Sequence, residues 1–243
     1  MAGTIVSGTI VDKARRQLFE IEVGSDTGAD IQWDRTRELL AFLNDAQREI
    51  AIAKPDAYVR NEAISLAAGA KQTLPAGGRM LNGSGIQHNM GADGLTPGRP
   101  ITLVDRLYLA RIRPSWMTDT GNYVEHYLYD QTDPRTYFVY PRPSGAWYVN
   151  ASFPADPPGI TEANIDSSAL GLIQIGDEYA PLLHDYIVGY ALLKTFKAES
   201  VQRAGFFLNK FYNALGRNFQ MKQATQPIDQ RAQETAPNAA GKA

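Results

Sequence analysis

Apolar side chains recur at helical spacing over residues 34–54 of the sequence. They fall on one side of a predicted helix: Leu39, Leu40, Leu43, Ala46, Ile50 and Ala53. Asp34 stands where a carboxylate can accept backbone N–H groups of the first turn, and Pro55 stops the helix. The pattern therefore predicts an amphipathic helix that needs partners along one side.

Three further stretches show the same spacing and predict helices over residues 9–21, 178–197 and 200–219. In the helix over 178–197, apolar residues extend beyond a single stripe, which indicates a helix covered on more than one side. Pro181 is tolerated there because it falls in the first turn.

Between these helices, residues 62–153 are rich in strand signals. Residues 63–68 and 72–74 predict a hairpin, and three aromatic runs predict an antiparallel meander over 123–129, 135–140 and 146–153. A strand at 101–104 precedes a short helix that Asp105 would cap.

Two stretches lack these patterns. Residues 75–100 hold seven glycines and predict a long loop, of the kind that is functional or becomes ordered against a neighbouring molecule. Residues 220–243 have few large apolar groups, so we expect an extended tail that needs a partner.

These elements predict an α+β fold. About four main helices form an antiparallel bundle with the antiparallel β-rich segment inserted, because neither helical pair has a complete core alone. Residues 1–219 are expected to form one domain, followed by the tail.

Composition removes several classes of function. The 243 residues include 24 Lys and Arg against 26 Asp and Glu, so the net charge of -2 gives no bulk attraction to phosphates. The absence of cysteine excludes disulfides and thiolate chemistry. The N-terminal residues lack the order of a signal peptide, and no apolar run approaches a membrane span, so we expect a protein in solution without a membrane anchor.

The middle of the chain nevertheless has a local positive bias. Its arginines are Arg99, Arg106, Arg111, Arg113, Arg135 and Arg142. They can pair with acidic groups across an interface or face a polyanion, although pairing on the surface of the chain itself is the default.

No catalytic, cofactor or metal site is expected. His88, His126 and His184 have no metal-type spacing, and Gly83-Ser84-Gly85 lacks the third glycine of a dinucleotide loop. Asp130 and Asp133 could be imagined as an acid/base pair, but the surrounding residues explain them well as turn formers, which is the preferred interpretation. With the aromatic strands, these aspartates keep open the alternative of a carbohydrate-binding or glycan-hydrolysing tail protein.

Several stretches, in this order, resemble one family of proteins: TRELLAFLNDAQREIAIAKPDA, LPAGGRML, RPITLVDRLYLARIRPSW, VEHYLYDQTDPRTYFVYPRP and GDEYAPLLHDYIVGYALLK. The family is that of the head-to-tail adaptor (connector) proteins of short-tailed bacteriophages, and the resemblance spans roughly residues 8–218. LNDAQREI and DPRTYFVYP are its most specific parts, and none of the stretches is a catalytic signature.

The resemblance implies a structural virion protein without enzymatic activity, assembled in the host cytoplasm. It would form a twelve-fold ring between the portal and a tail nozzle or tail tube protein, with DNA passing through. The C-terminal segment, residues 220–243, would supply the portal contacts, for which we name Gln220, Met221, Gln226, Pro227, Ile228 and Arg231. Contacts with a neighbouring subunit or with the phage tail are expected at Arg35, Arg37, Arg48, Arg79 and His88.

Overall fold

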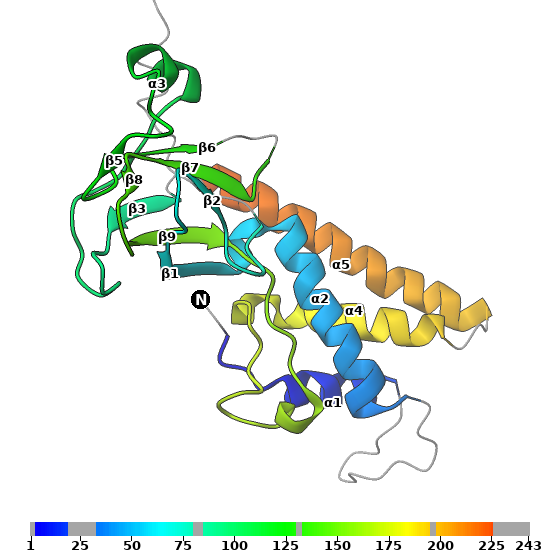
Figure 1. Ribbon diagram of the computed structural model, residues 1–243. Helices are drawn as coiled ribbons and strands as arrows, with labels where there is room; N and C mark the ends of the chain where they lie inside the picture. The colour runs from blue at the N-terminus through cyan, green and yellow to red at the C-terminus, as the bar shows by residue number, and fades with distance from the viewer. Residues whose placement is uncertain (1–2, 19–32, 80–84, 130–132, 195–197, 226–243) are drawn as a thin grey trace, which may run out of the picture.

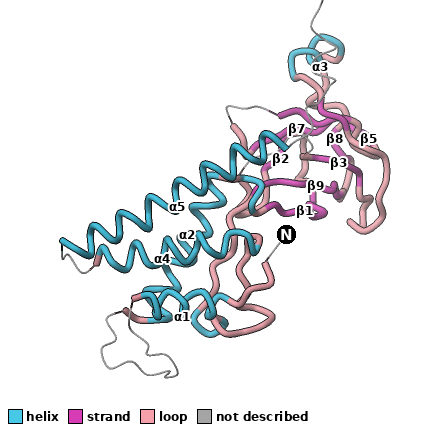
Figure 2. The backbone as a smooth tube through the Cα atoms, turned by 180° about the vertical axis from the view of Figure 1, so that it is seen from behind, coloured by secondary structure: helices cyan, strands magenta, loops and turns pink. Residues whose placement is uncertain are grey.

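The computed structural model describes residues 3–18, 33–79, 85–129, 133–194 and 198–225. Within these residues the fold is α+β, with five α-helices and several small sheets (Figure 1). Helices α1, α2, α4 and α5 gather in one part of the molecule, here called the helical region. The strands lie in another part, the β region, which runs from Val59 to Pro154, and Figure 2 shows the same division from behind.

The helical region is organised around α4. Its members are α1 (Ser7–Gln17), α2 (Leu40–Ala53), α4 (Ala180–Leu193) and α5 (Ala198–Thr225). Helix α4 packs against each of the other three, and most of its side chains are buried, which confirms the prediction from its broad apolar pattern. The predicted stripe of α2 also has its partners, since α2 packs against α1 and α4.

Different hydrogen bonds determine where the first two helices, α1 and α2, begin. Asp34 accepts hydrogen bonds from the backbone N–H groups of Thr36 and Arg37, at 2.8 and 2.9 Å, as predicted. A π-helical turn, Arg35–Leu39, follows and leads into α2. Helix α1 begins at Ser7 rather than at residue 9 because tertiary contacts bind its first N–H groups: that of Ser7 donates to the Gly171 carbonyl at 2.8 Å. No local sequence signal reports such a contact.

Other helix bounds need correction. Helix α1 ends at Gln17, so Leu18, predicted to be helical, lies in a turn, and the remaining predicted residues, 19–21, lie outside the described residues. A 3-10 turn, Asp177–Tyr179, precedes α4, which ends at Leu193, while residues 195–197 are also outside. Helix α5 continues to Thr225, so residues 220–225, expected in an extended tail, are helical.

The strands of the β region form three small sheets. They are β1 (Val59–Ser65), β2 (Lys71–Thr73), β3 (Ile86–Asn89), β4 (Thr102–Leu103), β5 (Thr120–Gly121), β6 (His126–Tyr129), β7 (Thr136–Tyr140), β8 (Arg142–Pro143) and β9 (Tyr148–Pro154). The sheet orders are β1-β9-β3, β2-β7-β6-β4 and β5-β8. All pairs are antiparallel except β4–β6 and β5–β8, which are parallel.

Three predictions about the β region are wrong. Strands β1 and β2 form no hairpin, since β1 pairs with β9 and β2 pairs with β7. The expected meander ends after β6 and β7, because β9 pairs with β1 and β3 instead. The glycine-rich segment 75–100 is not a continuous loop, since it contributes β3. Alternation of side chains identifies a strand, but it carries no information about the partner.

Separate hydrophobic clusters fill the two regions. The helical core includes isoleucines of the segment 156–176, which folds back onto the helices between β9 and α4. Buried aromatic side chains such as Tyr127, Tyr137 and Phe153 fill the β core. At the far end of the β region, Figure 1 shows helix α3 (Arg106–Ile112), and Asp105 caps it by accepting from the N–H of Tyr108 at 2.9 Å.

Candidate functional site and interaction surfaces

The described residues contain no group of three or more His, Asp or Glu side chains that could hold a metal ion. The three histidines lie on different elements, with His88 on β3, His126 on β6 and His184 on α4. His126 is engaged locally, because its Nδ1 lies 2.6 Å from the hydroxyl of Thr102. The geometry therefore offers no metal or nucleophile site built from these side chains.

The carbohydrate alternative finds little support. Asp130 lies outside the described residues, and the carbonyl of Asp133 accepts from the Thr136 N–H at 3.0 Å, as in a turn. Of the aromatic strand residues, Tyr127 and Tyr137 are buried in the β core, and burial raises the pKa of both hydroxyls. Side chains that fill a core cannot stack on a sugar ring.

Arg35 joins three segments of the helical region. Its Nε and Nη2 donate to the two carboxylate oxygens of Asp12 on α1, at 2.7 and 2.9 Å. Its Nη1 and Nη2 donate to Asp166, at 2.9 and 2.6 Å. These bonds hold the pKa of Asp166 below its ordinary value and raise that of the guanidinium. The contact predicted for a neighbouring subunit is thus occupied inside the chain.

The other predicted contact residues occupy different surfaces. Arg37 and Arg48 are exposed beside and on α2, and Arg48 pairs with Asp45 at 3.2 Å, one helical turn away. Arg79 pairs with Asp156. His88 is exposed on β3, an edge strand of its sheet. The structure does not bring these four side chains together into one patch.

The residues predicted to contact the portal are divided by the end of α5. Gln220 and Met221 lie within the helix. The remaining four, Gln226, Pro227, Ile228 and Arg231, lie outside the described residues.

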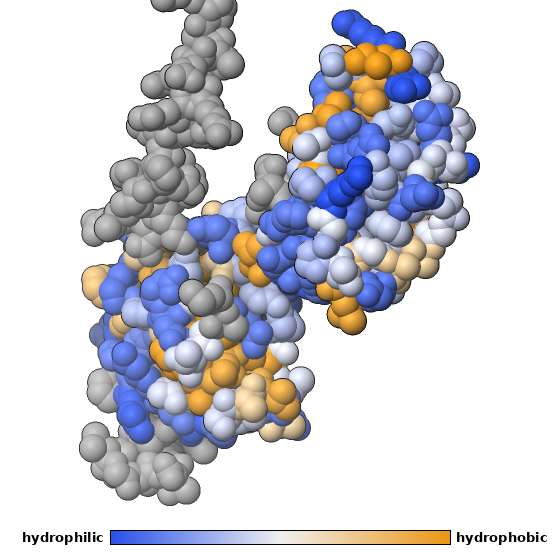
Figure 3. Space-filling model, turned by 90° about the vertical axis from the view of Figure 1, so that its left-hand side faces the viewer, coloured by the Kyte–Doolittle hydropathy of each residue, from blue (hydrophilic) through white to orange (hydrophobic). Residues whose placement is uncertain are grey.

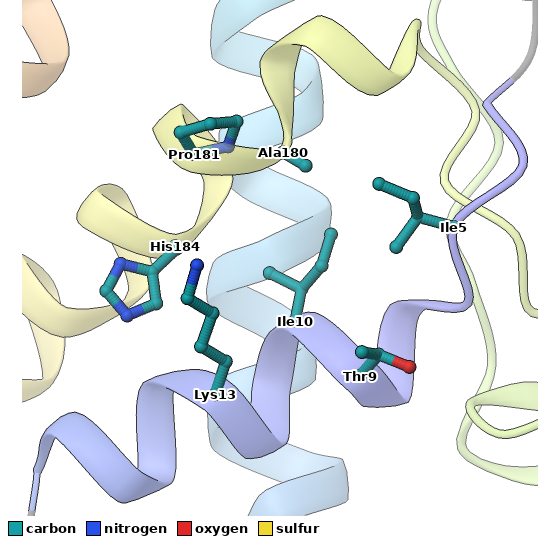
Figure 4. A pocket seen from close by; sticks show the side chains of 7 residues that line it. All are labelled: Ile5, Thr9, Ile10, Lys13, Ala180, Pro181 and His184. Atoms are coloured by element: carbon teal, nitrogen blue, oxygen red, sulfur yellow. The ribbon is translucent and has the colours of Figure 1, made fainter.

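A cavity of about 190 Å³ lies between α1 and the first turn of α4 (Figure 4). Its lining residues are Ile5, Thr9, Ile10, Lys13, Ala180, Pro181 and His184. Next to it, Asp185 is buried, which opposes ionisation, but hydrogen bonds from His184 and from Lys210 at 2.8 Å outweigh burial and lower its pKa. This ion pair joins α4 to α5 and is fully explained by helix packing.

A second cavity, of about 270 Å³, lies in the β region. It is lined by Ala92, Gly121, Asn122, Pro143, Ser144, Gly145, Ala146 and Trp147. None of these side chains titrates near neutral pH, so the cavity offers neither a general acid nor a general base.

The outer face of α5 is exposed and carries little charge. The exposed positions on the side opposite the buried stripe include Glu199, Gln202, Phe206, Asn209, Asn213 and Gly216, and of these only Glu199, in the first turn, is charged. Phe206 is 65% exposed although it is one of the largest apolar side chains of the helix. Uncharged surfaces that carry aromatic side chains are typical of the centres of protein interfaces. The sequence pattern predicts the buried stripe of α5, but it does not mark this opposite face.

The described residues thus form two packed regions and an exposed face on α5 that is poor in charge. None of the described helices is long and apolar enough to span a bilayer. The family model described as SU10 adaptor protein matches residues 7–240, and the chain belongs to this family of phage head–tail adaptors. The resemblance predicted from the sequence is thereby confirmed. No curated protein matches the chain.

Membership of this family determines the general role of the protein. The protein is a structural phage adaptor, and such an adaptor is a component of the virion.

Proposed function

We propose that the protein forms a ring that joins the portal of the capsid to a tail nozzle or tail tube protein and continues the DNA passage. The observation that carries the proposal is the exposed outer face of α5, which is poor in charge and carries Phe206, in a chain of the adaptor family. That face remains open after α5 has packed onto α4, so it is available for the next subunit.

A ring requires a heterologous contact, in which one face of a subunit meets a different face of the next and rotation closes the circle. Exposed Phe206 would be the central apolar contact of one face, and the exposed Arg37 and Arg48, beside and on α2, would belong to the contacts between subunits. The proposed stoichiometry is twelve subunits, as the resemblance implies. Arg35 and Arg79 are paired inside the chain, and we assign them to the fold rather than to the ring.

The remaining assignments follow from this architecture. The four helices act as an antiparallel bundle within one adaptor domain, residues 1–219, and the residues after α5 contact the portal. The protein performs no catalysis and binds no cofactor, and its contact with passing DNA is non-specific. It resides at the head–tail junction of the virion after assembly in the host cytoplasm.

The ring contact can be tested by introducing a charge into the outer face of α5. Phe206→Glu places a charge at the centre of the proposed contact, and Leu170→Glu is a matched control because Leu170 is also 65% exposed but lies outside α5. Sedimentation velocity and electron micrographs of each protein, alone and with the portal, should show rings for the control and smaller species for Phe206→Glu. Equal assembly of both variants would refute the assignment of this face.

The portal contact can be tested separately by ending the chain after Thr225. The shortened protein should keep its helical circular dichroism and its rings but bind the portal at least tenfold more weakly. Unchanged portal affinity would contradict the role of residues 226–243.

A further inference from the structure

Exposed apolar side chains concentrate around helix α3. Of the twelve large hydrophobic side chains that are exposed in the described chain, five fall in the short stretch 103–117 on and around α3, here called the α3 tip: Leu103, Leu107, Tyr108, Ile112 and Met117. Leu107 is 71%, Tyr108 61% and Ile112 56% exposed. Such clustering marks an interaction site, whereas exposed apolar residues scattered singly are ordinary.

The fold itself does not require these side chains. Helix α3 is held to the β region by Leu109, which packs with Trp116 and Leu128, and by the cap at Asp105. At 100° per residue, Leu107 lies about 160° and Tyr108 about 100° around the helix axis from Leu109. Ile112 lies nearer to Leu109, at about 60°, yet it is 56% exposed. Helix α3 therefore exposes large apolar side chains at positions where a surface without a partner usually carries polar ones.

Positive charge accompanies the apolar residues. Arg106 lies over the ring of Phe138, with 5.0 Å between its Cζ and the ring centroid. Arg111 and Arg113 are exposed, and within the described part of the chain no carboxylate pairs with either. Figure 3 shows hydrophobic and strongly hydrophilic residues side by side at this end of the molecule.

We propose that the α3 tip docks into an apolar groove, bordered by carboxylates, on a tail protein different from this chain. A short helix that offers large apolar anchors fits a groove, and unpaired arginines beside the anchors are complemented by acidic groups at its margin. The match is one of shape, apolar area and charge.

Two other occupants fit less well. On DNA, phosphates would face Arg111, but Leu107, which lies one turn away on the same side of α3, would meet phosphates too. In a second copy, the cavities described above supply no carboxylate: one carries Lys13 and His184, and the other has no charged lining residue.

The assignment to the tail side rests on the proposed function. In the proposed function, the residues beyond α5 contact the portal. The other partner, the tail protein, is therefore assigned to the α3 tip. Figure 1 shows the tip at the end of the β region, away from α1, α2 and α4.

The experiment uses the full chain and two probes, the purified portal protein and the purified tail protein encoded in the same phage genome. Leu107→Ser with Ile112→Ser removes the anchors, and Arg111→Glu with Arg113→Glu reverses the charge. Leu170→Ser and Arg16→Glu are matched controls at exposed positions elsewhere. Affinities are measured by biolayer interferometry, with thermal unfolding followed by circular dichroism to confirm that each variant folds.

Both α3 variants should bind the tail protein at least tenfold more weakly, keep portal binding within twofold and form rings. Binding of the wild-type protein to the tail protein should weaken from 0.1 to 0.5 M salt more than that of the charge variant. Tail binding within twofold of the wild type overturns the proposal, as does loss of ring formation, which would assign the tip to a second copy. Loss of binding to a 20-base-pair DNA with tail binding intact overturns it as well. If the wild-type protein binds neither probe, the proposed function fails together with the inference.

Discussion

Replacing Asn89 by leucine should destabilise the β region strongly. Asn89 is 2% exposed, and its side chain makes four hydrogen bonds. Its Nδ2 donates to the carbonyls of Arg99 and Val124 at 3.0 and 2.7 Å. Its Oδ1 accepts from the Val124 N–H at 2.9 Å and from the Trp147 indole at 2.8 Å. One amide thus joins β3, the segment before β4, the segment before β6 and the segment before β9.

The magnitude follows from the groups that lose their partners. Leucine has nearly the same shape but no polar atom, so both the N–H and the carbonyl of Val124 are orphaned in a buried site. The Arg99 carbonyl keeps the bond from the backbone N–H of Asn89, and the partly buried Trp147 indole can turn to water. Each buried orphan costs about 1–3 kcal/mol, so the free energy of unfolding should fall by about 4 kcal/mol.

Urea unfolding followed by far-ultraviolet circular dichroism and tryptophan fluorescence measures this change, since Trp147 reports on the site itself. Asn61→Leu is the control, because Asn61 is exposed on β1, and it should change stability by less than about 0.5 kcal/mol. Hydrogen exchange should accelerate at the amide of Val124 in the Asn89 variant. A loss below about 1 kcal/mol, or no more than that of the control, would refute the reasoning.

Two further predictions concern the helical region. A Cβ at Gly189 would lie 2.8 Å from Leu208, so Gly189→Val should cost about 1–3 kcal/mol in urea unfolding, whereas Gly205→Val, which meets nothing within 4 Å, should cost none; equal effects would contradict the close approach of α4 and α5. Arg35→Met should cost up to about 1 kcal/mol at neutral pH, because Asp166 is largely exposed. The lowered pKa of Asp166 makes this contribution present above about pH 4 and lost as the pH falls through the folded-state pKa, so unfolding curves of the two proteins should converge in acid; a constant difference down to pH 2 would exclude the ion pair as the cause.

Local signals in the sequence predicted local structure well. Asp34 and Asp105 cap their helices as expected, because a cap depends on residues two or three positions away. Pro181 likewise falls in the first turn of α4. The family resemblance rests on the order of such segments and is confirmed.

Long-range pairing was not predictable in the same way. The alternating pattern of β1 is satisfied equally by a hairpin with β2 and by the observed pairing with β9, which accompanies burial of Ile64 in the β core. The start of α1 at Ser7 depends on carbonyls of residues 165 and 171, far away in the sequence.

The candidate surfaces were the least predictable part. Leu107 and Ile112 have the same chemistry as core residues, and only the orientation of α3 makes them exposed. Conversely, Arg35 has the chemistry of a surface contact, yet two carboxylates of its own chain surround it.

The pairing of β1 with β9 also orders events during synthesis. Val59 faces Pro154, so the sheet cannot close until nearly a hundred residues have left the ribosome after its first strand. The helical core waits longer, because α1 needs α4 as its partner. Helix α5 docks onto α4 later still, and its outer face takes shape only afterwards. If that face forms the proposed ring contact, nascent chains held close together on one messenger lack a finished face with which to associate prematurely.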